Sequence, residues 1–160
     1  HDLCPAVRIG QITAQVRAAV VRAAAAVAGP LVLTGHSAGG HLVARMACAD
    51  VALPVIGRVM RVVPISPIAN LAPLMATAMN ADLRIDPPEA AAESPMLHPR
   101  PGVPVAIRVG GAERPVFLDQ ARWLGRAWAA PVVVEAGRHH FDIVAGLEEA
   151  GSDLMGTLLG

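Results

Sequence analysis

Apolar and polar residues alternate along the chain with two different periods, which predict helices and buried strands in turn. Apolar residues recur at helical spacing over residues 9–27, 41–49, 118–128 and 148–159. Short apolar runs over residues 31–34, 59–65, 103–109 and 132–135 are followed closely by glycine or by Ser-Pro and predict strands. Continuous apolar strands separated by helices are typical of a parallel sheet that is covered on both faces. We therefore expect an α/β fold in which a parallel sheet of about four strands is flanked by helices.

Residues 70–101 fit this alternation poorly. The stretch carries several prolines with helical patches between them: Pro73, Pro87, Pro88, Pro95 and Pro99. It is too long for an ordinary loop. We predict a cap-like excursion over the sheet, within a single domain that spans residues 1–160.

Composition excludes several classes of partner. The 160 residues carry no formal net charge, which argues against electrostatic binding to nucleic acid or to an anionic membrane. No apolar run reaches the roughly 18 residues that a membrane-spanning helix needs. Cys4 and Cys48 have no metal-ligand or redox spacing and are expected to be buried free thiols in a reducing cytoplasm. Composition therefore argues against nucleic acid and membranes as partners and favours a cytoplasmic location.

The sequence Gly35-His36-Ser37-Ala38-Gly39 lies directly between a predicted strand and a predicted helix. The pattern Gly-x-Ser-x-Gly in that context is typical of a sharp, strained turn that presents a nucleophilic serine above a sheet. We expect Gly35 and Gly39 to be glycine because side chains there would collide with the neighbouring strand and helix. The Ala38 N–H, at the positive end of the helix, is the expected donor to an oxyanion. Ser37 is thus the predicted nucleophile.

A serine nucleophile needs a base, which is usually a histidine. His41 lies on the helix after the turn and is expected to point away from Ser37, and His98 lies among prolines and is expected to be solvated. His139 and His140 follow the last predicted strand, where a fold with this turn places its base. The pattern alone does not choose between these two histidines.

The base in turn needs an acid, placed between the serine and the histidine along the chain. Glu113 follows the predicted strand 103–109 and is the preferred candidate. Asp119 falls inside a helix, Glu135 ends the histidine's own strand, and Asp142 is better placed to bind local backbone amides.

Three segments together resemble one family. They are Gly-His-Ser-Ala-Gly-Gly-His from residue 35, Val-Gly-Gly-Ala-Glu-Arg-Pro-Val-Phe from residue 109 and Gly-Arg-His-His-Phe-Asp-Ile from residue 137. They resemble the bacterial kynurenine formamidases (arylformamidases), which belong to the hormone-sensitive-lipase-like esterases of the α/β-hydrolase superfamily. The resemblance implies that His140 is the base, that Glu113 is the acid, and that no metal or organic cofactor takes part. It also implies hydrolysis of an N-formyl amide, as in tryptophan catabolism, through an acyl-enzyme on Ser37.

In that family about four strands and a His-Gly-Gly oxyanion loop precede the part that this chain matches. We therefore expect the C-terminal portion of an α/β-hydrolase fold. Ala69 and Asn70 also depart from the family pattern. Two other interpretations stay open: a generic short-chain carboxylesterase or lactonase, and a catalytically inactive truncated fragment. The strand 31–34 would then be an open sheet edge, through which the chain is expected to form a homodimer or to self-associate.

Overall fold

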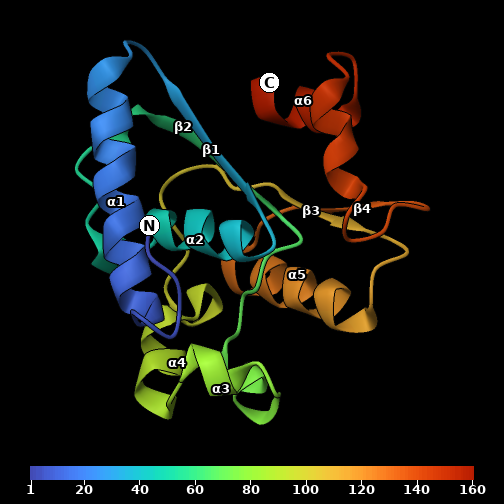
Figure 1. Cartoon of the computed structure of the whole chain (residues 1–160). Helices are drawn as coiled ribbons and strands as arrows, with labels where there is room; N and C mark the ends of the chain where they lie inside the picture. Colours follow the sequence, from blue (N-terminus) through green and yellow to red (C-terminus); the bar gives the residue numbers. More distant parts are fainter.

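The centre of the molecule is a parallel sheet of four strands in the order β1-β2-β3-β4 (Figure 1). The structure is a computed structural model that describes all residues from 1 to 160. Its strands are β1 (Leu31–His36), β2 (Val59–Ile65), β3 (Ile107–Gly110) and β4 (Val132–Glu135). All three strand pairs are parallel. The predicted parallel sheet is confirmed.

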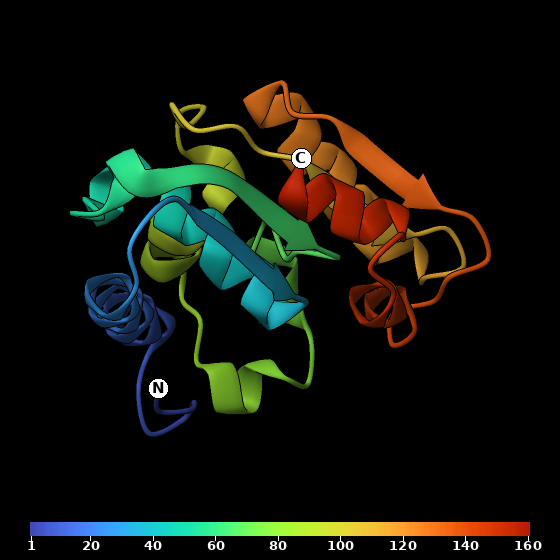
Figure 2. The ribbon, with the colours of Figure 1, turned by 90° about the horizontal axis from the view of Figure 1, so that it is seen from above.

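Four helices flank the sheet: α1 (Ile9–Ala26), α2 (Ala38–Ala47), α5 (Pro115–Trp128) and α6 (Asp153–Leu159). Helix α2 packs on β1 and β2, and α5 packs on β3. Helix α6 also contacts β1 and β2, but from the opposite face of the sheet (Figure 2). No helix combines the length and the apolar character that crossing a membrane requires.

The largest apolar core lies between the sheet and the helices α2 and α5. Val62 and Ile107 come from the strands, and Met46, Leu124 and Trp128 come from the helices. Each of these side chains is at most 1% exposed. Burying one side chain of this size contributes about 1.5–3 kcal/mol, so this core holds α2 and α5 firmly against the sheet.

Two predicted elements differ from the structure. The third strand begins at Ile107, not at residue 103, because Pro104 lacks an N–H and only an isolated bridge joins Val105 to Val62. The predicted helix 148–159 begins only at Asp153, as α6, and Glu148 is instead the last residue of a separate 3-10 helix, Ile143–Glu148. Ser152 begins α6 by accepting a hydrogen bond from the Met155 N–H.

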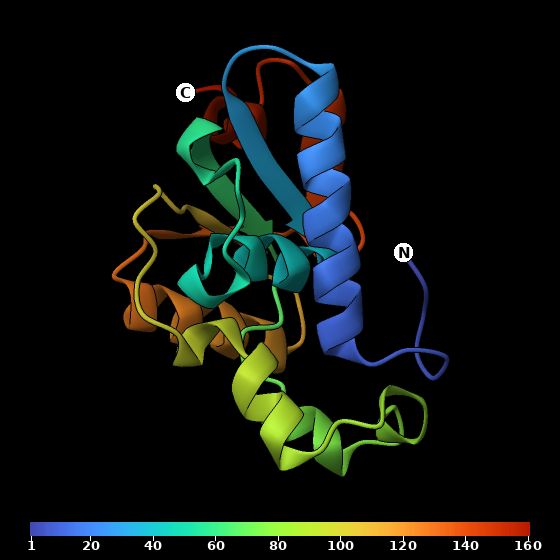
Figure 3. The same ribbon diagram turned by 90° about the vertical axis from the view of Figure 1, so that its left-hand side faces the viewer.

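Residues 70–101 form four short helices: η3 (Ala72–Ala76), α3 (Asn80–Leu83), α4 (Pro87–Glu93) and η4 (Pro95–Leu97). Figure 3 shows α4 beside the amino-terminal end of α1. The Arg8 guanidinium pairs with Asp86 (2.9 Å) and Glu89 (2.7 Å). Glu93 accepts hydrogen bonds from the Thr13 hydroxyl (2.6 Å) and from Arg45 Nε (3.1 Å). Ionic contacts therefore fasten α4 to α1 and α2.

The carboxyl-terminal end of α1 is capped from a distant part of the chain. The Arg58 guanidinium donates hydrogen bonds to the carbonyl oxygens of Ala24 (2.6 Å), Val27 (2.6 Å) and Gly29 (2.8 Å). The last carbonyls of a helix have no partner within it, and a planar cation with several donors satisfies them well.

Candidate active site

Ser37 occupies the turn between β1 and α2. Its φ and ψ angles of 57° and −116° lie outside the conformations that L-residues prefer, at a cost of about 1–3 kcal/mol. The turn is held by two hydrogen bonds, from the Ser37 N–H to the Ile65 carbonyl (2.9 Å) and from the His41 N–H to the Ser37 carbonyl (3.0 Å). The predicted sharp turn is therefore present, with the serine at its tip.

Two glycines make this turn possible. A Cβ on Gly35 would lie 2.4 Å from the Gly39 carbonyl oxygen, and a Cβ on Gly40 would lie 2.8 Å from the Ile65 carbonyl oxygen. A Cβ on Gly39 would meet nothing within 4 Å. The steric prediction is correct for Gly35 and wrong for Gly39, because it is the next residue, Gly40, that faces β1 and β2.

Ser37, His140 and Glu113 come together across the carboxyl-terminal ends of the strands. His140 Nε2 lies 3.0 Å from Ser37 Oγ, and His140 Nδ1 lies 2.6 Å from Glu113 Oε2. An ionised carboxylate can only accept, so Nδ1 carries the proton and Nε2 is free to accept from the serine hydroxyl. This is the arrangement in which an imidazole can remove the hydroxyl proton.

The Glu113 carboxylate is fully buried and receives further hydrogen bonds. The Ser66 hydroxyl (2.5 Å) and the Gly110 N–H (2.8 Å) both donate to its Oε1 oxygen. Ser66 was not among the residues predicted from the sequence. The available signal was its position directly after a buried strand, because the carboxyl ends of parallel strands meet at one edge of the sheet.

Aromatic rings surround the His140 imidazole. Phe117 stacks on it with a ring-centroid distance of 4.0 Å, and the His36 ring lies 4.5 Å away. Phe141 meets it edge-on at 5.4 Å and is 80% exposed. Burial, followed by the neighbouring His140, lowers the pKa of His36, which favours its neutral form. Neither Phe117 nor His36 was predicted from the sequence to lie in the site.

The other histidines have partners elsewhere. His41 is buried with its Nδ1 at 3.0 Å from the Ile68 carbonyl, and burial lowers its pKa to about 4. His139 is exposed and lies 3.4 Å from Asp142, which also accepts the His139 N–H. His98 was predicted to be solvated, and this is wrong: its ring lies between Asp50 (3.2 Å) and the Ala92 carbonyl (2.8 Å).

The other acids are also engaged outside the site. Glu135 pairs with the buried Arg108 (2.8 Å). Asp119 is half-exposed on α5 beside Arg122. Of the four carboxylates considered, Glu113 is therefore the one that the structure brings to His140.

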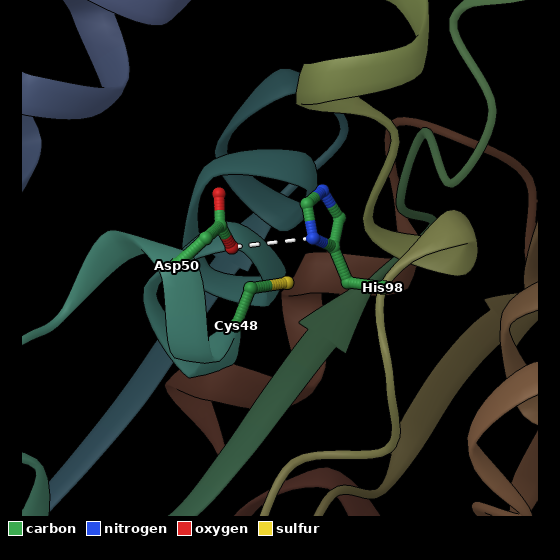
Figure 4. Close-up of side chains that lie close together, drawn as sticks. All are labelled: Cys48, Asp50 and His98. Carbon is green, nitrogen blue, oxygen red and sulfur yellow. Dashed lines mark ion pairs between the residues drawn. The ribbon is translucent and has the colours of Figure 1, made fainter.

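Cys48, Asp50 and His98 form a cluster whose ligand atoms lie within 4.8 Å of one another (Figure 4). The Arg45 guanidinium already bonds both oxygens of Asp50, at 2.7 and 3.2 Å. Burial raises the pKa of the Cys48 thiol to about 11, which keeps it protonated at neutral pH. A buried cation and a protonated thiol make this donor set a poor fit for a metal ion.

Ala38 is the first residue of α2, and the first N–H groups of a helix have no acceptor within that helix. The amino-terminal end of a helix carries a partial positive charge. Ala38 is therefore free to donate to a negatively charged group next to Ser37.

Known structures resemble this chain. A presumed thioesterase from Silicibacter sp. TM1040 is 46% identical, matches 100% of this chain and 62% of its own, and superposes with a TM-score of 0.95. A thermophilic esterase from Thermogutta terrifontis with bound butyrate is 23% identical over 86% of this chain and 58% of its own (TM-score 0.64). An acylaminoacyl peptidase is 13% identical over 81% of this chain and 23% of its own (TM-score 0.61). No protein-family model and no curated protein matches the chain.

These likenesses confirm the fold class: the chain forms part of an α/β-hydrolase fold. More particularly, it is a close structural match to the presumed thioesterase and spans 62% of that protein's length. None of these three proteins supports the narrower resemblance to the formamidase subgroup.

Proposed function

We propose that this chain carries the catalytic triad of a serine hydrolase that cleaves small carboxylic esters or thioesters. The observation that carries the proposal is that His140 lies within hydrogen-bond distance of both partners, with Nε2 at 3.0 Å from Ser37 Oγ and Nδ1 at 2.6 Å from Glu113 Oε2. The likeness to a presumed thioesterase at 46% identity supports this class of substrate. The butyrate bound to the esterase from Thermogutta terrifontis is a short acyl group of the size proposed.

The residues perform the following steps. His140 Nε2 takes the hydroxyl proton of Ser37 as Oγ attacks the acyl carbon, and the Ala38 N–H donates to the oxyanion that forms. The Nε2 proton then passes to the departing oxygen or sulfur, which leaves an acyl-enzyme on Ser37. A water molecule gives a proton to Nε2 as its oxygen attacks the acyl carbon. The bond between that carbon and Ser37 Oγ then breaks, Nε2 returns the proton to Oγ, and the carboxylic acid is released. Glu113 holds the imidazole in place and stabilises its charged form.

An N-formyl amide of an aromatic amine is the second candidate substrate. The three segments that resemble the kynurenine formamidases favour it, and so does the exposed ring of Phe141 beside His140. His140 protonates the leaving group in this mechanism, so a ring at 5.4 Å from it is well placed to contact an aromatic leaving group.

A fluorophosphonate probe, with the adduct located by peptide mass mapping, tests the triad directly. We expect labelling at Ser37 that is abolished in Ser37→Ala and strongly slowed in His140→Ala. His139→Ala is the matched control, because His139 is adjacent and exposed and its ring bonds only to its own loop, at Phe141 and Asp142. Absence of labelling in a folded sample would contradict the proposal and favour the inactive fragment. A panel of butyryl thioester, butyryl ester and N-formyl arylamine then separates the candidate substrates.

A further inference from the structure

We propose that Ser66 is a positioning residue whose hydroxyl holds the Glu113 carboxylate in the orientation that His140 requires. This inference rests on the proposed function. It concerns the group that orients the acid, which neither the sequence pattern nor the comparisons assign.

The donors around the carboxylate are divided unequally between its two oxygens. Oε1 accepts from the Ser66 hydroxyl at 2.5 Å and from the Gly110 N–H at 2.8 Å. Oε2 accepts from His140 Nδ1 at 2.6 Å. Both the Ser66 residue and the Glu113 side chain are 0% exposed, so water cannot replace a missing donor without rearrangement. The two donors on Oε1 therefore set the plane of the carboxylate and leave Oε2 to His140.

The backbone at Ser66 has an unusual conformation that directs its hydroxyl toward Glu113. Ser66 follows β2 directly with a φ of 47°, a left-handed conformation that serine adopts unfavourably. Its N–H donates to the Arg108 carbonyl of β3 at 2.7 Å. This conformation lets the hydroxyl reach the end of the neighbouring strand, where Glu113 follows Gly110. Strained residues of this kind persist where the surrounding structure fixes them, and they concentrate at functional sites.

Removal of the hydroxyl would leave Oε1 with a single donor. The buried carboxylate would then turn more freely, so His140 would be oriented less well. Loss of a hydrogen bond to a charged group, if it is felt fully in the transition state, corresponds to a rate that is about ten- to a hundredfold lower. The loss is expected in kcat and not in KM, because the Ser66 hydroxyl acts through Glu113 and makes no hydrogen bond to Ser37.

The experiment compares Ser66→Ala and Ser66→Gly with the wild-type chain. The rate of Ser37 labelling by a fluorophosphonate is measured from about pH 5 to 9, together with the proton NMR resonance of His140 Nδ1–H and the melting temperature. We expect both variants to label about ten- to a hundredfold more slowly across that range, with the Nδ1–H resonance displaced. Glycine accepts a positive φ without strain, so Ser66→Gly keeps the test open if Ser66→Ala fails to fold.

A double-mutant cycle separates positioning from a general structural role. In the Glu113→Gln background, Ser66→Ala should cost nothing further, because the carboxylate through which Ser66 acts is already absent. Wild-type labelling rates together with an unmoved Nδ1–H resonance would overturn the inference, as would fully additive losses in the cycle. If the folded wild-type chain is not labelled at all, the proposed function fails instead. The resonance then still decides whether Ser66 controls the Glu113–His140 pair.

Discussion

Alanine at Gly35 and alanine at Gly39 should have opposite consequences, although both glycines belong to the same five-residue motif. In Gly35→Ala the new Cβ would lie 2.4 Å from the Gly39 carbonyl oxygen and 2.6 Å from the Gly39 carbonyl carbon. Both atoms are backbone, so no side chain can rotate away and the turn itself must open. Overpacking of this kind costs about 1–3 kcal/mol, or about 2–12 °C in melting temperature at 2–4 °C per kcal/mol.

In Gly39→Ala the new Cβ would meet nothing within 4 Å. Gly39 lies in the first turn of α2, where alanine is a better helix former than glycine. We therefore expect Gly39→Ala to raise the free energy of unfolding by up to about 1 kcal/mol, and its melting temperature to equal or exceed that of the wild type.

The assay is thermal unfolding followed by circular dichroism, together with the rate of fluorophosphonate labelling at Ser37. Gly35→Ala should lose stability and most of its labelling rate, because the opened turn moves Oγ away from His140. Gly39→Ala should keep both. Equal behaviour of the two variants would refute the steric reasoning.

Three further predictions concern stability and association. Glu93→Ala leaves the buried Arg45 guanidinium with Asp50 as its only ionic partner and should lower the free energy of unfolding by about 3 kcal/mol. The control Asp119→Ala removes an exposed pair and should change it by less than about 1 kcal/mol. Similar melting temperatures for the two variants would argue against a structural role for Glu93. Because the folded-state pKa of His41 is lowered to about 4, the unfolded chain binds more protons than the folded chain below about pH 6.5. The free energy of unfolding should therefore fall by up to about 3 kcal/mol between pH 6.5 and 4. An equally steep loss in His41→Gln would contradict this. Strand β1 pairs only with β2, so the chain should self-associate through its open edge, less so in Val32→Lys; light scattering that finds a monomer at every concentration would rule this out.

The sheet could be predicted from the sequence because its strands are continuous apolar runs, a pattern that few other structures share. Strand β3 was predicted too long because the apolar pattern of residues 103–106 does not reveal that Pro104 cannot donate to a ladder. The excursion was predicted with helical patches between its prolines, but its attachment depends on pairs such as Arg8 with Glu89, which are 81 positions apart. Local pattern carries no information on contacts of that range.

The candidate site was partly predictable for the same reason. The serine turn is a local motif, and the ends of parallel strands meet at one edge, which made Glu113 a candidate. The choice of His140 over His139 came from a family resemblance, and the geometry now gives the physical basis: His140 reaches Glu113 and Ser37, while His139 pairs with Asp142. Ser66 belongs to none of the quoted motifs, and Phe117 ends one of them without any indication of its role, so only the fold shows that they lie beside Glu113 and His140.

The hydrogen bonds from Arg58 make the carboxyl-terminal end of α1 dependent on a residue that lies 29 to 34 positions further along the chain. The carbonyls of Ala24, Val27 and Gly29 receive their donors only when the segment leading into β2 is in place. The last turn of α1, β1 and the start of β2 should therefore behave as one cooperative unit in amide hydrogen exchange. Local opening at Arg58 would release the helix end and the strand that leads to the serine in a single event.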